Sequence, residues 1–76
     1  MRFTIYTKNN CAYCRLAKNF LEDKQLTYSE ISLDNPAFLS EFKQSNPNVR
    51  TVPFILDNEH NVVVGGYSDL RKYFNG

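Results

Sequence analysis

The sequence has 76 residues, with nine lysines and arginines against eight aspartates and glutamates, so the formal net charge is +1. This length predicts one domain over residues 1–76, and the balanced charge argues against a general nucleic-acid-binding protein. No run of about 18 apolar residues predicts a membrane span, and a strand-like pattern from residue 2 leaves no room for a signal peptide. Six phenylalanines and five tyrosines can supply a small aromatic core.

The first third of the chain predicts a strand followed by a helix. Residues 2–7 alternate in polarity and are rich in β-branched and aromatic side chains, which is typical of strands. Residues 15–24 place apolar side chains at helical spacing. The chain's two cysteines, Cys11 and Cys14, lie between these segments. We therefore expect the Cys-x-x-Cys motif to span the turn into the helix and the first helical turn.

This position favours redox chemistry by the cysteine pair. Unpaired backbone N–H groups and the helix dipole stabilise an anion at a helix N-terminus. The pKa of the Cys11 thiol should therefore fall below the free value of about 8.5, and Cys14 lies one turn further on. Residues 1–21 contain four basic and no acidic residues. We expect Lys8 and Lys18 to lie nearest the thiolate, the alternative being that they are ordinary surface lysines.

Two other interpretations of the cysteine pair are weaker. A structural disulfide across so short a loop would remove little entropy from the unfolded chain, and small disulfide-stapled domains carry more cysteines. A zinc site needs about four ligands, and only His60 could add a third. His60 lies in the polar run 57–61, which predicts a solvated turn. The free dithiol favours a reducing compartment, so we expect a cytoplasmic protein.

Two further elements follow the first helix. Residues 27–33 predict a second strand, which a right-handed crossover makes parallel to the first. A helix is expected from Pro36, because proline suits the first helical position and Asp34 or Asn35 can cap it. The turn-forming residues 45–48 should end this helix.

The last part of the chain predicts a hairpin and a third helix. Residues 49–56 predict a strand with Pro53 at its start or edge, and a cis Val52–Pro53 bond would expose the Val52 backbone. Residues 62–64 then form an antiparallel partner. Residues 67–74 predict a helix, with Ser68 as N-cap and Asp69 in the first turn. The order βαβαββα predicts an α/β fold, a four-stranded mixed sheet with helices on both faces.

Three segments of the chain resemble the glutaredoxin family of the thioredoxin fold. In order and spacing they are Cys11-Ala12-Tyr13-Cys14, Thr51-Val52-Pro53, and Gly65-Gly66 followed by Tyr67-Ser68-Asp69. Together, in so short a chain without tryptophan, they are far more specific than the cysteine motif alone. The chain departs from many members at Ala12, where proline is common, and at Tyr67, where a cysteine often follows the double glycine.

The resemblance implies a dithiol oxidoreductase that takes electrons from glutathione and reduces glutathione mixed disulfides and protein disulfides. Cys11 would be the nucleophile and Cys14 the resolving cysteine, with electrostatic support from Lys18. The implied glutathione-binding residues are Lys8, Tyr13, Arg50, Thr51, Val52, Pro53, Gly66, Tyr67, Ser68 and Asp69. The Val52 backbone would pair with the tripeptide as an added strand, and the helix start near Asp69 would hold its γ-glutamyl end.

The family resemblance leaves two alternatives open. One is a glutaredoxin-like redoxin that is reduced by thioredoxin reductase, which the glutathione-suited Gly65-Gly66 loop disfavours. The other is an iron–sulfur or metal-binding protein, which the second cysteine disfavours; we expect no metal. Ribonucleotide reductase is a credible electron acceptor under either oxidoreductase reading. We expect a monomer with glutathione and disulfide-containing proteins as partners.

Overall fold

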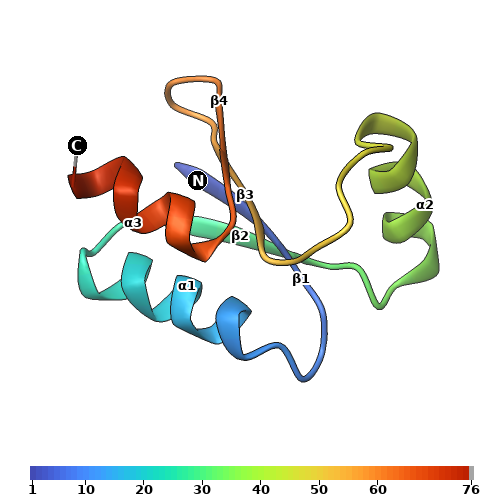
Figure 1. The fold of residues 1–76 in the computed structure, drawn as a ribbon, viewed down its shortest axis with the longest axis horizontal. Helices are drawn as coiled ribbons and strands as arrows, with labels where there is room; N and C mark the ends of the chain where they lie inside the picture. Colours follow the sequence, from blue (N-terminus) through green and yellow to red (C-terminus); the bar gives the residue numbers. More distant parts are fainter. Residues whose placement is uncertain (76) are drawn as a thin grey trace.

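The computed structural model describes residues 1–75, and its elements follow the expected order βαβαββα (Figure 1). The strands and helices are β1 (Phe3–Thr7), α1 (Ala12–Asp23), β2 (Tyr28–Ser32), α2 (Pro36–Ser45), β3 (Phe54–Asp57), β4 (Val62–Gly65) and α3 (Tyr67–Asn75). No helix in this range is long and apolar enough to cross a membrane.

One four-stranded mixed sheet organises the molecule, in the order β2-β1-β3-β4. β1 pairs with β2 in parallel and with β3 antiparallel, and β3 pairs antiparallel with β4. The crossover and the hairpin that the sequence predicts are therefore both confirmed. Because β1 is central, the loop that follows it starts from the middle of the sheet rather than from an edge.

The helices cover both faces of the sheet, as expected, and each face has its own core (Figure 1). Alternate residues of β1, Phe3 and Ile5, are fully buried with α1 and α3. On the opposite face Phe42 of α2 is buried against Phe54, and Tyr6 packs beside them. The alternation of side chains along a strand produces this two-sided burial.

The ends of α2 follow the sequence signals, whereas the start of α3 does not. Asn35 caps α2, where its Oδ1 accepts the N–H of Ala37 at 2.9 Å. Ser68 is not the N-cap of α3, because the helix already begins at Tyr67. Instead the Asp69 carboxylate reaches back and accepts the N–H of Gly66 at 2.9 Å. This arrangement satisfies the first helix donor as a capping box does.

One predicted boundary is confirmed and one is wrong. Helix α1 begins at Ala12, inside the cysteine motif as expected, and Cys11 itself is its N-cap. The strand predicted over residues 49–56 is shorter, because β3 begins only at Phe54. Pro53 has no N–H for a strand ladder, so pairing starts after it. The segment before Pro53 is left as a loop beside the sheet, and this loop enters the site.

Candidate active site

The cysteine motif lies where β1 leads into α1. Cys11 has an extended backbone conformation and occupies the N-cap position, and its Sγ accepts the backbone N–H of Cys14 at 3.1 Å. A sulfur atom thus takes the place that a serine or aspartate oxygen usually holds at a helix start. An N–H donor and the positive end of the helix dipole both favour negative charge on this sulfur.

The two cysteines differ in their access to solvent. They form a disulfide with each other. Cys11 is half-buried, while Cys14 is only 2% exposed. A large partner can therefore reach the Cys11 sulfur first. If that sulfur forms a mixed disulfide, the Cys14 sulfur is positioned to attack Cys11 Sγ and displace the attached group.

The loop before β3 lies beside the reactive sulfur. The Val52–Pro53 peptide bond is cis, and the Val52 carbonyl oxygen lies 3.9 Å from Cys11 Sγ. Among residues 1–75 the Val52 N–H has no hydrogen-bond acceptor. A backbone with an unused N–H can add an extended peptide as a further strand.

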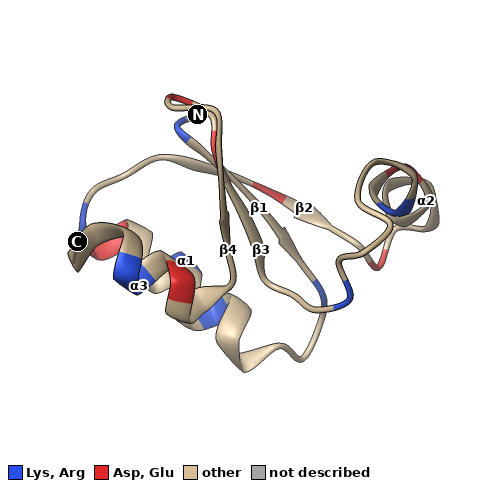
Figure 2. Cartoon of the chain, turned by 45° about the horizontal axis from the view of Figure 1, so that its top comes forward, with Lys and Arg blue, Asp and Glu red and all other residues tan. Residues whose placement is uncertain are grey.

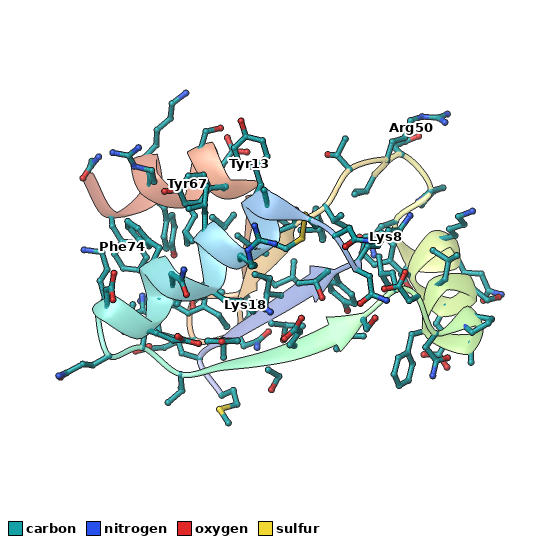
Figure 3. The ribbon with its side chains drawn as sticks, turned by 90° about the horizontal axis from the view of Figure 1, so that it is seen from below. Lys8, Tyr13, Lys18, Arg50, Tyr67 and Phe74 are labelled. Carbon is teal, nitrogen blue, oxygen red and sulfur yellow. A yellow bond between two sulfur atoms is a disulfide. The ribbon has the colours of Figure 1, made fainter. Side chains whose placement is uncertain are left out.

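The glycine pair at the end of β4 forms a second wall beside that loop. Gly65 has a φ of +107°, and a Cβ there would lie 2.7 Å from Asp69 Oδ2, so this position requires glycine. A Cβ on Gly66 would lie 3.8 Å from the Pro53 carbonyl oxygen, which places this loop against the cis-proline loop. The rings of Tyr13 and Tyr67 lie 6.1 Å apart at the rim (Figure 3).

Two hollows adjoin the motif, and their electrostatics differ. The first, about 250 Å³, is lined by both cysteines and by Lys18 and Glu30. Lys18 Nζ lies 3.2 Å from the Glu30 carboxylate, which also accepts the hydroxyl of the buried Thr7 at 2.7 Å. The hydrogen bond from Thr7, together with Lys18, lowers the pKa of Glu30. Glu30 therefore offsets part of the Lys18 charge near the sulfurs.

The second hollow is a basic groove of about 500 Å³ between α2 and the loop before β3. We call it the basic groove; its lining includes the cations Lys8, Lys43 and Arg50, the apolar side chains Leu39, Phe42 and Val49, and the loop residues Thr51 and Val52. Figure 3 shows Lys8 between the disulfide and α2, and Arg50 on the loop beyond it. Lys8 lines both hollows and so connects them.

The structure brings most of the expected site residues together. Around Cys11 they form two walls, one from the loop at Val52 and one from the glycine pair and Tyr67, with Tyr13 at the rim. Ser68 is exposed and makes no hydrogen bond through its side chain within residues 1–75. No group of three or more histidine, cysteine, aspartate or glutamate side chains that could hold a metal is found in that range.

Sequence reasoning missed Glu30 and Lys43. Glu30 lies in a strand-like stretch, and only the parallel register that sets it against Ile5 brings it to the dithiol hollow. Lys43 is the basic residue of the last turn of α2, where a helix-dipole role explains it equally well. No local signal identifies either residue as part of the site.

Comparison with known proteins gives a consistent result at the sequence level. A family model described as glutaredoxin matches residues 3–61. The chain is 37% identical over 67 residues to glutaredoxin 3 of Escherichia coli, which covers 87% of this chain and 77% of that protein. It is 40% identical over 72 residues to glutaredoxin 1 of Rickettsia bellii, with 87% and 69% coverage. It spans only 28% of a Haemophilus influenzae hybrid peroxiredoxin and 44% of bovine mitochondrial glutaredoxin-2, two longer relatives.

Solved structures agree on the fold. Glutaredoxin 1 of Francisella tularensis superposes with a TM-score of 0.74 at 28% identity, covering 97% of this chain and 96% of that one. A buckwheat glutaredoxin in complex with glutathione gives 0.78 at 22% identity, with 97% and 68% coverage. The NrdH-redoxin of Escherichia coli, whose activity profile is described as thioredoxin-like, gives 0.72 at 24% identity, with 93% coverage of each chain. The last two likenesses bear on the fold alone.

Proposed function

Because this chain belongs to the glutaredoxin family, we propose that it is a thiol-disulfide oxidoreductase whose Cys11–Cys14 dithiol is kept reduced by glutathione. The observation that carries this proposal is the position of Cys11 as the N-cap of α1. Its Sγ accepts a backbone N–H and lies beside the free edge of Val52. That sulfur is activated as an anion and accessible to a partner.

Reaction with a glutathione mixed disulfide begins at the half-buried sulfur. The Cys11 thiolate attacks the glutathione sulfur, the disulfide bond of the substrate breaks, and the other thiol leaves and takes up a proton. Glutathione is then bound to Cys11 as a mixed disulfide. The thiolate of a second glutathione attacks the sulfur of the bound glutathione, releasing the Cys11 thiolate and oxidised glutathione. The net exchange consumes one glutathione: the substrate sulfur is reduced to a thiol, and the two glutathionyl groups leave together as oxidised glutathione.

A protein disulfide uses both cysteines. Cys11 forms a mixed disulfide with one sulfur of the protein substrate, and the second substrate sulfur leaves as a thiolate. The deprotonated Cys14 then attacks Cys11, forms the intramolecular disulfide and releases the first substrate sulfur. The substrate disulfide is thus reduced to two thiols as the dithiol is oxidised. Burial of Cys14 at 2% exposure suits this order, because an incoming protein cannot reach it first.

Glutathione binding is supported by the two walls around Cys11. The unused N–H and the carbonyl of Val52 can pair with the cysteinyl residue of the tripeptide as a strand would. The start of α3 offers backbone N–H groups and a positive dipole to the γ-glutamyl carboxylate. Lys8 and Arg50 line the groove at the other end, where the glycine carboxylate would lie.

Two cysteine variants test the proposal. Cys11→Ser should lower turnover of a glutathione mixed disulfide to the uncatalysed rate, since no sulfur remains to attack. Cys14→Ser should keep that turnover within a few-fold and lose reduction of a protein disulfide. The measurement is NADPH consumption coupled through glutathione reductase, with insulin as the protein disulfide. Activity in Cys11→Ser, or equal loss of both reactions in Cys14→Ser, would contradict these roles.

The source of electrons needs a separate comparison. We propose glutathione because the Gly65-Gly66 loop and Asp69 form a compact helix start against the Pro53 loop. Coupling the assay to thioredoxin reductase without glutathione should give turnover below one tenth of the glutathione-coupled rate. A faster reductase-coupled rate would favour a thioredoxin-reductase-dependent redoxin instead. We also propose a cytoplasmic location and, as one electron acceptor to assay, ribonucleotide reductase.

A further inference from the structure

The basic groove is larger and more apolar than the proposed glutathione contacts require. Those contacts use Val52, Lys8 and Arg50. The whole groove measures about 500 Å³, and its lining extends to an apolar wall, Leu39 and Phe42 of α2. A polar tripeptide has no aliphatic side chain to place on that wall, so this part of the groove suits a larger occupant.

The charge of the groove is positive and uncompensated. Lys8, Lys43 and Arg50 line it, and no acidic side chain among residues 1–75 does. In the described part of the chain, none of these three cations forms an ion pair. Lys18 on the other side of the dithiol, by contrast, is paired with Glu30. Figure 2 shows basic positions on α2 and on the loops beside it. Such a field attracts negative charge and increases association rates with acidic partners.

The groove also lies next to the reacting sulfur. Val52 lines the groove, and the carbonyl oxygen of Val52 is 3.9 Å from Cys11 Sγ. A polypeptide whose cysteine is joined to Cys11 would therefore meet the Val52 backbone first and continue into the groove. Strand addition sends alternate side chains to opposite sides, so one side chain in two would face the apolar wall.

We propose that the basic groove binds an extended acidic segment of the protein disulfide substrate, next to its reacting cysteine. An aliphatic side chain of that segment would rest against Leu39 and Phe42, and its carboxylates would meet Lys43 and Arg50. This inference rests on the proposed function, because it names the class of protein substrate for the same sulfur. The chemistry is unchanged: the substrate disulfide gains two electrons and the Cys11–Cys14 dithiol loses them.

The test compares charge variants in a single turnover. Lys43→Glu reverses one charge in the groove, and Lys72→Glu is a matched control, since Lys72 is likewise basic in the last turn of a helix but lies outside the groove. Pre-reduced protein is mixed with either of two disulfide peptides, without glutathione. One carries Glu and Leu beside the cysteine, and the other carries Lys and Leu. The readout is the second-order rate of reduction.

We expect wild-type protein to reduce the acidic peptide about 10-fold faster than the basic one, with the preference shrinking at high salt. Lys43→Glu should abolish or reverse that preference, while Lys72→Glu should stay within two-fold of wild type. Turnover of a small glutathione mixed disulfide, measured separately, should be unchanged in Lys72→Glu and should fall far less in Lys43→Glu than reduction of the acidic peptide. Absence of a preference in wild type, or equal effects of the two substitutions, would overturn the proposal.

Two further experimental outcomes would also decide whether the basic groove binds an acidic substrate segment. If Lys43→Glu slows turnover of the small glutathione mixed disulfide as much as it slows reduction of the acidic peptide, the groove binds glutathione, and the proposal is wrong. If sedimentation shows a dimer that Lys43→Glu dissociates, the occupant is a second copy, and the proposal is again wrong. Failure of the glutathione-coupled assay alone would overturn glutathione dependence while leaving the peptide comparison valid, because the peptides are reduced without glutathione.

Discussion

The two ends of β1 differ in how completely hydrogen-bond donors surround a group that carries or can carry negative charge. At one end, beyond Thr7, the Cys11 sulfur receives a single backbone N–H and remains half exposed. At the other end, beside Phe3, the carboxylate of Asp57 is 1% exposed and fully surrounded by donors. We refer to these as the dithiol end and the carboxylate end.

The carboxylate end joins three elements through one buried anion. Asp57 accepts the hydroxyl of Tyr73 at 2.6 Å, contacts His60 Nδ1 at 2.8 Å and Arg2 at 3.3 Å, and accepts the N–H of Glu59 at 3.0 Å. It thus ties β1, the β3–β4 turn and α3 together. A buried charge contributes to stability only when its hydrogen bonds are complete, and here they are.

The comparison explains where reactivity can exist in so small a fold. The Asp57 carboxylate is buried and its oxygens are already hydrogen-bonded, so it cannot react with or bind a ligand. The Cys11 sulfur is favoured as an anion by a helix start but is not saturated with donors, so it can still attack. The same physical forces therefore stabilise the structure at one end and activate a nucleophile at the other.

The largest effect should come from removing the charge at the carboxylate end. Asp57→Asn keeps the volume but loses charge-assisted hydrogen bonds from Tyr73, His60 and Arg2, so we expect a loss of about 3 kcal/mol in the free energy of unfolding. Glutathione-coupled turnover should stay within two-fold at a temperature where the variant is folded. Urea denaturation measures the first effect. Asp23→Asn, an exposed carboxylate, is the control and should change stability by less than about 0.5 kcal/mol.

The pH dependence provides an independent check of this cause. Burial raises the pKa of Asp57, but the hydrogen bonds from Tyr73, His60 and Arg2 outweigh burial and lower it overall. A lowered pKa in the folded state gives stability that is present above the unfolded value of about 3.9 and is lost as pH falls below it. The stability gap between wild type and Asp57→Asn should therefore narrow below about pH 4. A constant gap would mean that packing, not charge, causes the loss.

The sequence is sufficient for the element order, the parallel pairing of β1 with β2, the β3–β4 hairpin and the presence of helices on both faces of the sheet. The alternation of polarity over residues 2–7 and the helical spacing of apolar residues in α1 reflect burial directly. The sequence pattern therefore predicts the strand β1 and the helix α1 well. One boundary and one capping group are missed. Pro53 delays the start of β3 to Phe54, and the back-reaching Asp69 replaces Ser68 as the capping group of α3.

The site is predictable to a smaller extent. The cysteine pair, Val52 and the glycine loop carry local signatures, since each needs a special backbone or sulfur chemistry. Lys43 and Glu30 have no such signature. They enter the site because α2 folds over the loop before β3 and because β2 pairs in one particular register. Their roles follow only once separate elements are placed in space.

An intermediate effect is expected from the glycine loop at the dithiol end. Gly65→Ala places a Cβ in a positive-φ conformation and against the Asp69 carboxylate, and should cost about 1–2 kcal/mol of stability. The Asp69 contact that holds the start of α3 would shift, so the KM for glutathione should rise several-fold while Cys11 still reacts with a small alkylating agent. Gly66→Ala, whose Cβ would have only ordinary contacts, should destabilise less. Equal losses in the two variants would argue against the backbone explanation.

The smallest effect on stability should come from the Lys18–Glu30 ion pair at the dithiol end. Glu30→Gln keeps an acceptor for the buried Thr7 hydroxyl and removes the partner of Lys18. Because this pair is partly exposed, the free energy of unfolding should change by less than about 0.5 kcal/mol.

The change in thiolate chemistry gives the informative readout for the same substitution. In Glu30→Gln, Lys18 is no longer offset, so the pKa of Cys11 should fall, and in Lys18→Gln it should rise. Both are measured from the ultraviolet absorbance of the thiolate in a Cys14→Ser background, which leaves one sulfur to titrate. The shifts should shrink with added salt, as expected for charges acting through solvent. Shifts of the same sign in the two variants would show that packing around Thr7, rather than the charge pair, sets the state of the sulfur.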